Sequence, residues 1–406
     1  MHLLACASSY LTLGYILNKN KKGTKRGATV EPFKLWMNEQ LISTTADIFK
    51  RVYVAFNAEQ FRVEACEGLD RMELKERASH IMAALDRHLP EDFDHFNDIA
   101  LSALHPNEDP SAAGFEFGPE GLMGVAAWPL TDLVTKRGLD FPEKALPLLK
   151  EVTKRFSAEF AIRPFLDQHT DYTLSVLSGW LDDPNRHVRR LISEGSRPRL
   201  PWGMQLRSFV ADPQPILPFL EALKDDPEEY VRRSVANNLN DIAKDHASTV
   251  AAIARVWLQT NDRNRIRLVK HACRTLIKQG DADTLKAFGY LPVKNIAANL
   301  HIETPAVSYG DALEFRVEVS GGLPNVPAMV DYAIHFVKAN GGTSPKVFKW
   351  KDSKLDKNGS LQGQKKHTIK PITTRVYYPG MHKLEVLVNG VSVAVEPFEL
   401  LMEPER

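Results

Sequence analysis

Cysteine is scarce in this sequence, which excludes a fold held together by disulfides and a zinc site of the CxxC type. Only Cys6, Cys66 and Cys273 occur among 406 residues. An odd number of widely separated cysteines supplies neither a disulfide framework nor a CxxC zinc signature. The simplest interpretation is a reducing, cytoplasmic compartment.

A hydrophobic run long enough to cross a bilayer is also missing. Residues 3–17 are mostly apolar, but this stretch falls short of the roughly 20 residues that a spanning helix needs. Its basic residues follow at 18–27, whereas a signal peptide carries its charges before the apolar run. A weak membrane anchor stays an alternative. We expect instead a disordered extension over residues 1–29 and no membrane partner.

Net charge and catalytic motifs are scarce as well. The 52 Lys and Arg residues almost balance 51 Asp and Glu residues, for a net charge of +1. Taken alone, that balance argues against a nucleic-acid binder, because such proteins often carry a basic excess. The sequence has no P-loop, GxSxG, HExxH or dinucleotide-binding glycine motif. It therefore predicts neither a metal site nor a cofactor.

What is present over residues 31–289 is a succession of helical patterns with an internal repeat. Apolar residues recur at spacings of three and four. DPNRHVRRLISEG at 183–195 and DPEEYVRRSVANN at 226–238 align at a constant offset of 43 residues, and a looser copy follows at 266–276. Two-helix repeats of about 40–47 residues are typical of HEAT and armadillo solenoids. We expect each Asp-Pro to start the second helix of a repeat, with Asp as its N-cap.

After residue 290 the pattern changes to short alternating strands bounded by Gly, Asn and Pro. About seven strands without a cysteine pair fit an immunoglobulin-like sandwich. The expected fold is a multidomain α-then-β chain, in which a HEAT-like α-solenoid precedes a small immunoglobulin-like β-sandwich. Its expected domains cover residues 30–292 and 296–403.

Local counts change the interpretation of the charge. Six cations and no carboxylate lie between residues 263 and 278, and eight lysines against two aspartates lie between 346 and 370. The repeat helices add further arginines. Such clusters can follow a phosphate backbone and release its counterions. Solvated helix faces and a lysine-rich loop are the alternative, but three clusters together favour a polyanionic partner.

The segment SEGSRPRLPW at 193–202 is the most unusual part of the helical half. It ends a repeat helix with Glu194 and then carries two arginines, two prolines and Trp202. A Trp beside prolines usually packs an inter-repeat loop, and an acidic residue among arginines usually forms a structural ion pair. On pattern alone, this stretch is only suggestive of a site.

This segment and three others carry a family resemblance. RRLISEGSRPRLPW at 189–202, EPFKLWMNEQLI at 31–42, EFAIRPFL at 159–166 and VRRSVANNLNDIAKDH at 231–246 resemble the AlkC branch of the HEAT-like DNA alkylation-repair glycosylases. The C-terminal sandwich resembles the longer form of that family. The resemblance covers the chain from about residue 31 to its end.

The resemblance implies excision of cationic N3-methylated bases, 3-methyladenine and also 3-methylcytosine, from double-stranded DNA by a cytoplasmic, nucleoid-associated monomer. It implies a catalytic cluster of Glu159, Glu194, Trp202 and Asp241, in which a surface position for Glu159 stays an alternative. A second set of residues is expected to contact DNA: Arg190, Arg197, Arg199, Arg232, Arg233, Asn237, Asn238, Lys270 and His271. The lysine-rich segment 346–370 is the candidate contact of the β domain.

These residue types suit the chemistry independently of the resemblance. An N3-methylated base is already cationic and leaves readily, and breaking its N-glycosidic bond places positive charge on the sugar. Carboxylates near C1′ stabilise that charge and orient water, without a metal. Glu194 and Asp241 are the favoured stabilisers, and Trp202 is expected to stack on the base or the sugar. A non-catalytic HEAT-repeat DNA-binding or protein-scaffold module remains the alternative function.

Overall fold

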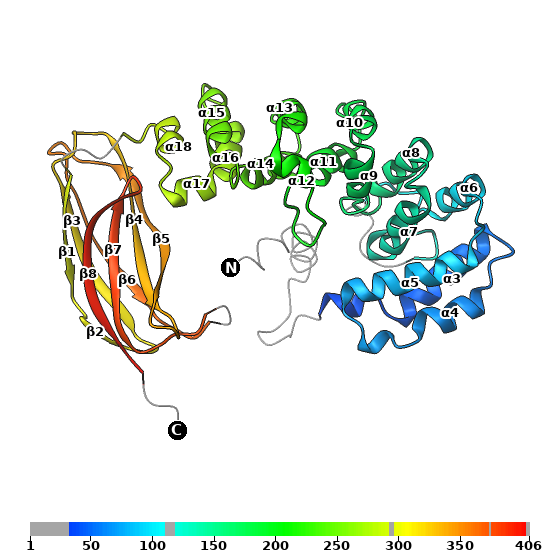
Figure 1. Cartoon of the computed structure of the whole chain (residues 1–406), viewed down its shortest axis with the longest axis horizontal. Coiled ribbons are helices and arrows are strands. Elements are labelled where there is room, and N and C mark those ends of the chain that lie inside the picture. The colour runs from blue at the N-terminus through cyan, green and yellow to red at the C-terminus, as the bar shows by residue number, and fades with distance from the viewer. Residues whose placement is uncertain (1–31, 110–117, 292–295, 373–374, 403–406) are drawn as a thin grey trace. The chain divides into compact units, whose positions relative to one another are not determined.

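The computed structural model describes residues 32–109, 118–291, 296–372 and 375–402. Helices occupy the chain from Phe33 to Ala287 and strands from Ala297 to Leu401, which confirms the expected order of a helical-repeat region and a β domain (Figure 1). The expected extension over residues 1–29 lies outside the described residues. Within the described residues, no helix combines the length and the hydropathy that crossing a bilayer requires.

The chain divides into two compact units, Met1–Ile242 and Ala243–Arg406. This division falls inside the expected domain 30–292. The expected junction with the β domain falls on residues 292–295, which are not among those described. The boundaries of the domains therefore stay a prediction.

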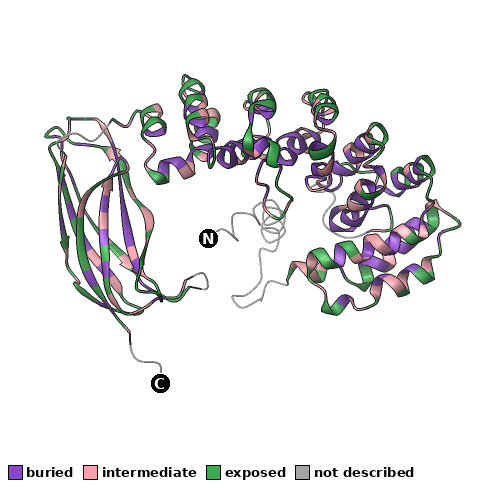
Figure 2. Ribbon diagram, in the orientation of Figure 1, coloured by how far each residue is buried: buried purple, intermediate pink, exposed green. Residues whose placement is uncertain are grey.

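The first unit is built of helices that pack on their chain neighbours and bury one face each. Figure 2 shows buried residues along the sides of these helices that meet other helices, with exposed residues opposite. Asn38 and Asp92 cap two of the helices by accepting backbone hydrogen bonds from the first turn. The α-helices are α3 (Glu39–Val52), α4 (Ala58–Cys66), α5 (Leu74–His88), α6 (Phe93–Ala103), α7 (Trp128–Gly138), α8 (Pro142–Thr153), α9 (Arg163–Gln168), α10 (Thr170–Ser178), α11 (Arg186–Gly195), α12 (Arg207–Ala211), α13 (Leu217–Leu223) and α14 (Glu229–Ile242).

The repeated segments form α11 and α14, which pack against each other and against α13. The expected role of the Asp-Pro pair is wrong in its detail. Asp183 Oδ1 accepts the N–H of Asn185 at 2.8 Å, and Asn185 Oδ1 caps α11 by accepting the N–H of His187 at 2.8 Å. Asp226 likewise accepts the N–H of Glu228 at 2.9 Å, ahead of α14. The aspartate therefore makes an Asx-turn before the helix, because its side chain bonds to the backbone two residues on, and the helix begins after that turn.

The second unit combines four helices with the β domain. The helices are α15 (Ala247–Trp257), α16 (Arg263–Ala272), α17 (Arg274–Gln279) and α18 (Ala282–Ala287). The strands are β1 (Ala297–Ile302), β2 (Ala306–Ser308), β3 (Ala312–Ser320), β4 (Pro327–Val337), β5 (Thr343–Lys354), β6 (Leu361–Thr368), β7 (Gly380–Val388) and β8 (Val391–Leu401). One sheet has the order β1-β3-β6 and the other β2-β8-β7-β4-β5, with β2 parallel to β8 and every other pair antiparallel.

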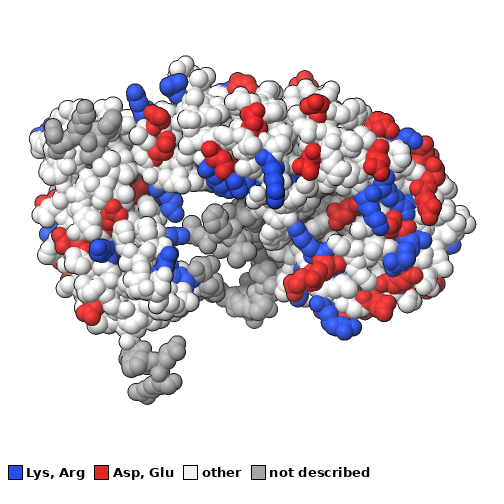
Figure 3. Space-filling model, in the orientation of Figure 1, with Lys and Arg blue, Asp and Glu red and all other residues white. Residues whose placement is uncertain are grey.

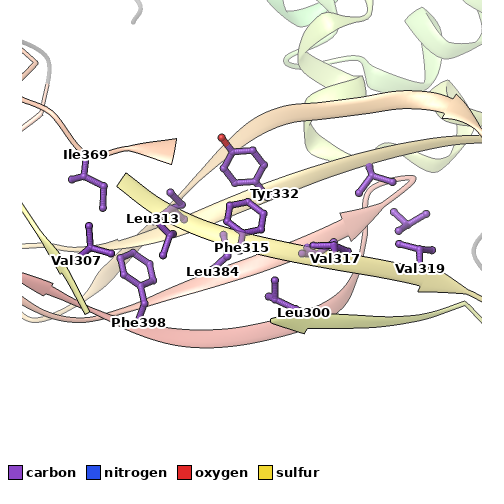
Figure 4. Packing of buried hydrophobic residues seen from close by; sticks show 14 of the residues in the cluster. Leu300, Val307, Leu313, Phe315, Val317, Val319, Tyr332, Ile369, Leu384 and Phe398 are labelled. Carbon is purple, nitrogen blue, oxygen red and sulfur yellow. The ribbon is translucent and has the colours of Figure 1, made fainter. Parts of the chain in front are cut away.

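The two sheets enclose one hydrophobic core. Leu313, Phe315 and Val317 alternate along β3 and are at most 1% exposed, as a strand with one buried face requires. Figure 4 shows these side chains in the same core as Leu384 of β7 and Phe398 of β8. This packing of a three-stranded antiparallel sheet on a mixed five-stranded sheet is the expected sandwich.

The helices of the second unit contact the β domain at close range. A Cβ built on Gly390 would lie 2.3 Å from the Cα atom of Gly280, so the two backbones meet where no side chain fits. Asp352 on β5 accepts a hydrogen bond from the Tyr290 hydroxyl at 2.7 Å and pairs with Lys270 Nζ at 3.1 Å. The β domain is therefore held to α16–α18 by direct contacts.

Candidate active site

Three carboxylates from separate segments come together inside the first unit. Glu159 lies between α8 and α9, Glu194 in the last turn of α11, and Asp241 in the last turn of α14. Their exposed fractions are 4%, 2% and 2%. Arg190 and Arg197, which are also buried, lie between them. Three residues of the expected catalytic cluster thus share one buried network, and Glu159 is not a surface carboxylate.

The two arginines bridge the carboxylates in a chain. Arg190 Nη1 lies 2.7 Å from Glu159 Oε2, and its Nη2 lies 3.6 Å from Glu194 Oε1. Arg197 Nη1 donates to the same oxygen of Glu194 at 2.6 Å. Both Nε and Nη2 of Arg197 lie 2.7 Å from Asp241 Oδ2. Glu194 is therefore the central carboxylate, contacted by both guanidinium groups.

Serine hydroxyls also bind two of the carboxylates. Ser234 Oγ donates to Glu194 Oε2 at 2.6 Å, and Ser157 Oγ donates to Glu159 Oε2 at 2.9 Å. Ser193 Oγ in turn donates to Ser234 Oγ at 2.8 Å. These bonds fix the carboxylates in one orientation before any substrate arrives, which is the condition for electrostatic preorganisation.

The paired groups of the cluster stabilise one another in their ionised forms. Burial by itself would raise the pKa of Glu194, but Arg197 and Arg190, with the Ser234 hydrogen bond, lower that pKa from 4.5 to about 2. Burial would lower the pKa of both arginines, but Glu194 and Asp241 raise the pKa of Arg197 above the ordinary arginine value. Tyr230, with Glu159 and Glu194, raises that of Arg190. Glu194 is therefore ionised throughout the neutral range, and pairing offsets the cost of burying its charge.

A fully buried arginine braces the turn that follows Glu194. Arg163, at the start of α9, is 0% exposed. Its Nη1 donates to the carbonyl oxygens of Gly195 and Arg197, both at 2.7 Å, and its Nε donates to that of Met204 at 2.8 Å. Burial, with the nearby Arg197, lowers the pKa of Arg163 to about 10, which keeps it cationic at neutral pH. Arg163 was not among the expected site residues, because nothing in its local sequence pattern separates it from a surface arginine.

Two glycines let this turn lie close to α9. A Cβ on Gly195 would be 2.5 Å from Ile162 Cγ2, and one on Gly203 would be 3.3 Å from Arg163 Cδ. Trp202 lies at the tip of the turn with φ 66° and is 45% exposed. The indole therefore lies at the surface, on a turn that is bound to the carboxylate cluster through Arg197 and to α9 through Arg163.

Arg190, Arg197 and Asn238 are placed differently from the expected DNA contacts. Both guanidinium groups are turned inward to carboxylates, as described above. Asn238 is 0% exposed, and its Nδ2 donates to the Ser193 carbonyl oxygen at 2.9 Å and to Ser196 Oγ at 3.2 Å. These three side chains organise the interior of the cluster, so we reassign them from phosphate contacts to structural ones.

Arg232 also has structural partners, which are backbone carbonyl oxygens, and the equivalent arginine of the preceding repeat makes the same contacts. Arg189 Nη1 donates to the carbonyl oxygens of Asp183 and Pro184, at 2.8 and 3.2 Å. Forty-three residues later, Arg232 Nη1 donates to those of Asp226 and Pro227. The first arginine of each Val-Arg-Arg therefore closes the Asp-Pro turn that precedes its own helix.

The other expected DNA contacts remain predictions. Arg233 is exposed and Arg199 and Asn237 are half-buried in the first unit; in the second, Lys270 is exposed and His271 half-buried. Figure 3 shows cationic and acidic side chains interspersed over the N-terminal helices on the face in view. Charges that balance there allow cationic clusters elsewhere in a chain whose net charge is near zero.

Six of the eight lysines of segment 346–370 lie on two edge strands of the sandwich, four on β5 and two on β6. β5 ends the five-stranded sheet, and β6 ends the three-stranded one. The strands adjoin, because Lys351 Nζ on β5 donates to the Gln362 carbonyl oxygen on β6 at 3.3 Å. Lys349, Lys351 and Lys354 are exposed. This edge is thus a cationic surface of the kind expected for a polyanion contact.

Comparisons with known proteins agree with this architecture. Residues 296–402 match the family described as the C-terminal Ig-like domain of the uncharacterised protein YhaZ. The uncharacterised protein YhaZ of Bacillus subtilis (strain 168) is 36% identical over 355 residues, which cover 87% of this chain and 95% of YhaZ. The structure is similar to that of the Pseudomonas fluorescens alkylpurine DNA glycosylase AlkC bound to DNA containing an abasic site analog. That similarity has a TM-score of 0.80 and 33% identity, over 91% of this chain and all of the AlkC chain.

Proposed function

This chain belongs to the family of AlkC and YhaZ, and from that premise we propose that it is a DNA glycosylase for cationic N3-alkylated bases. Its substrates are 3-methyladenine and also 3-methylcytosine in double-stranded DNA. The buried cluster of Glu159, Glu194 and Asp241 is the observation that supports this function best. It acts as a monomer in the cytoplasm, on nucleoid DNA.

The cluster suits a reaction that generates positive charge on a sugar. The methylated base leaves as a neutral molecule once the N-glycosidic bond breaks, and the deoxyribose becomes oxocarbenium-like. Fixed carboxylates stabilise that cation without having to reorient during the reaction. Water attacks C1′, and one carboxylate orients it and takes its proton. The products are the free base and an abasic site.

The contacts of each residue suggest its role in the reaction. Glu194 has a bound guanidinium or hydroxyl on each oxygen, so we assign it to electrostatic stabilisation. Asp241 receives two bonds from Arg197, and we assign it to the same stabilisation, with one of these two carboxylates orienting the water. Glu159 supports the cluster through Arg190. Trp202 stacks on the cationic base or the deoxyribose, a contact of about 0.5–2 kcal/mol.

DNA binding is assigned to surfaces on both units. Arg199, Arg233 and Asn237 contact phosphates beside the cluster, and Lys270 and His271 contribute from the second unit. The lysine edge of β5 and β6 contacts DNA through the sandwich. Bending of the duplex, rather than deep burial of a flipped base, brings the lesion to the carboxylates.

The test measures 3-methyladenine released from methylated DNA by the full chain, alongside the variants Trp202→Ala and Asp241→Asn. We expect release by the wild type and slower release by both variants, with unchanged helical circular dichroism. Glu221→Gln, at an exposed glutamate paired with Lys224, is the matched control and keeps the wild-type rate.

Two outcomes would overturn the proposal. No base release with intact, steeply salt-dependent DNA binding would identify a non-catalytic DNA-binding module. No binding to DNA at all, with an activity that tolerates Asp241→Asn, would identify a protein scaffold instead.

A further inference from the structure

Trp202 has a backbone conformation that its side chain does not favour. Among the described residues, three other than glycine have positive φ angles: Trp202, Asn325 and Asn389. Asparagine adopts the left-handed region with little penalty, whereas a bulky aromatic residue there is a genuine outlier. Such strain persists only where surrounding contacts enforce it, and it concentrates at functional sites.

Different contacts hold the base and the tip of the turn that carries Trp202. Arg163 binds the carbonyl oxygens of Arg197 and Met204 on either side of the turn. Inside it, the N–H of Gly203 donates to the Leu200 carbonyl oxygen at 3.1 Å. None of these bonds uses the carbonyl oxygen of Trp202 itself. That oxygen instead accepts a hydrogen bond from Lys75 Nζ, which comes from the first turn of α5.

The ammonium of Lys75 is itself positioned by α7 and by the segment of Glu159. It lies 5.3 Å from the ring centroid of Phe160, the residue after Glu159. Phe160 stacks on Trp128 with centroids 6.0 Å apart. The Trp128 side chain donates a hydrogen bond to Asp132, which interacts electrostatically with Lys75. A cation held over an aromatic face and near a carboxylate loses much of its freedom to swing into solvent.

We propose that Lys75 is a positioning residue that holds the strained Trp202 turn and so places the indole for the proposed base release. The inference rests on the proposed function for its catalytic consequence, but the contact itself can be tested without any activity. Lys75 acts through the backbone of Trp202, so it stabilises the conformation of the turn and contributes nothing to DNA affinity through phosphate. It is separated from Trp202 by 127 residues, and only the fold brings them together.

The first test measures hydrogen exchange of peptides covering residues 198–206 in the free protein. Lys75→Met keeps the aliphatic stem and removes the donor, so we expect faster exchange in this segment. Lys75→Arg keeps a cationic donor and should restore most of the protection. Lys136→Met is the matched control, since Lys136 is an exposed lysine of α7 paired with Asp86, and it should leave the segment unchanged. Unchanged exchange in Lys75→Met overturns the proposal.

The second test measures single-turnover base release at saturating enzyme. We expect Lys75→Met to slow release roughly three- to tenfold, the effect of losing about one hydrogen bond, with DNA affinity unchanged. In a Trp202→Ala background the same substitution should have no further effect. An equal loss in both backgrounds, or a weaker affinity with a shallower salt dependence, would mean that Lys75 acts independently of Trp202. If the wild type releases no base, the proposed function fails, and the exchange experiment still decides whether Lys75 holds the turn.

Discussion

Replacing Glu194 by Gln tests whether the buried network depends on the charge at its centre. Glutamine keeps the size of the side chain and can still accept the Ser234 hydrogen bond. It removes the negative charge that Arg197 and Arg190 share, and so leaves two buried cations with one fewer partner. The substitution therefore isolates the electrostatic contribution from the packing.

The structure sets the size of the effect. Lowering the pKa of Glu194 from 4.5 to about 2 corresponds to about 3 kcal/mol of stabilisation of its ionised form. Breaking a buried pair by removal of one partner costs about 3–5 kcal/mol, which agrees. Because the pKa is lower in the folded chain, this stabilisation is complete above pH 4.5 and is lost as the pH falls toward 2. We therefore expect Glu194→Gln to lower the free energy of local opening of α11 by about 3 kcal/mol at pH 7 and by almost nothing near pH 2.

The assay is the free energy of local opening at the α11 amides, measured by hydrogen exchange between pH 2 and 7 with correction for intrinsic rates. This readout avoids assuming that both units unfold in one transition. Glu221→Gln, at an exposed pair, should change the same quantity by less than about 0.5 kcal/mol at any pH. The reasoning would be refuted if Glu194→Gln lowered this free energy by no more than the control does. It would also be refuted if the decrease stayed the same toward pH 2.

Three further predictions concern close backbone contacts and charge. Gly195→Ala places a methyl group against α9 and should lower the free energy of unfolding of the first unit by about 1–3 kcal/mol, measured by urea denaturation. Gly390→Ala combines a φ of 80° with a Cβ 2.3 Å from Gly280, so exchange over α17 and α18 should accelerate; an unchanged rate would mean that this contact is unimportant. Arg233→Ala should reduce the slope of log K against log salt by about 0.9 for methylated and undamaged DNA alike, and an unchanged slope would exclude Arg233 as a phosphate contact.

Much of the architecture is determined by local features that a sequence displays directly. Apolar spacing determines the helices and the alternating strands, and the copies at 183–195 and 226–238 indicate stacked two-helix units through their constant offset alone. Caps and turns follow from residues a few positions apart, although the Asx-turn at Asp183 shows that a helix start can move by two residues. The unusual segment 193–202 also brings two residues of the proposed site, Glu194 and Trp202, close together in the chain.

Only the tertiary structure decides which charges face one another. Arg190 and Arg233 occupy the same repeat position, 43 residues apart, yet Arg190 is 3% exposed and bound to Glu159 while Arg233 is exposed. The repeat cannot distinguish them, because Glu159 comes from an earlier segment that reaches only the first copy. The same holds for Lys75 and for Arg163, whose partners lie far along the chain. The periodic sequence therefore determines where side chains are placed on each helix, and the stacking of non-repeated segments determines which of them form the site.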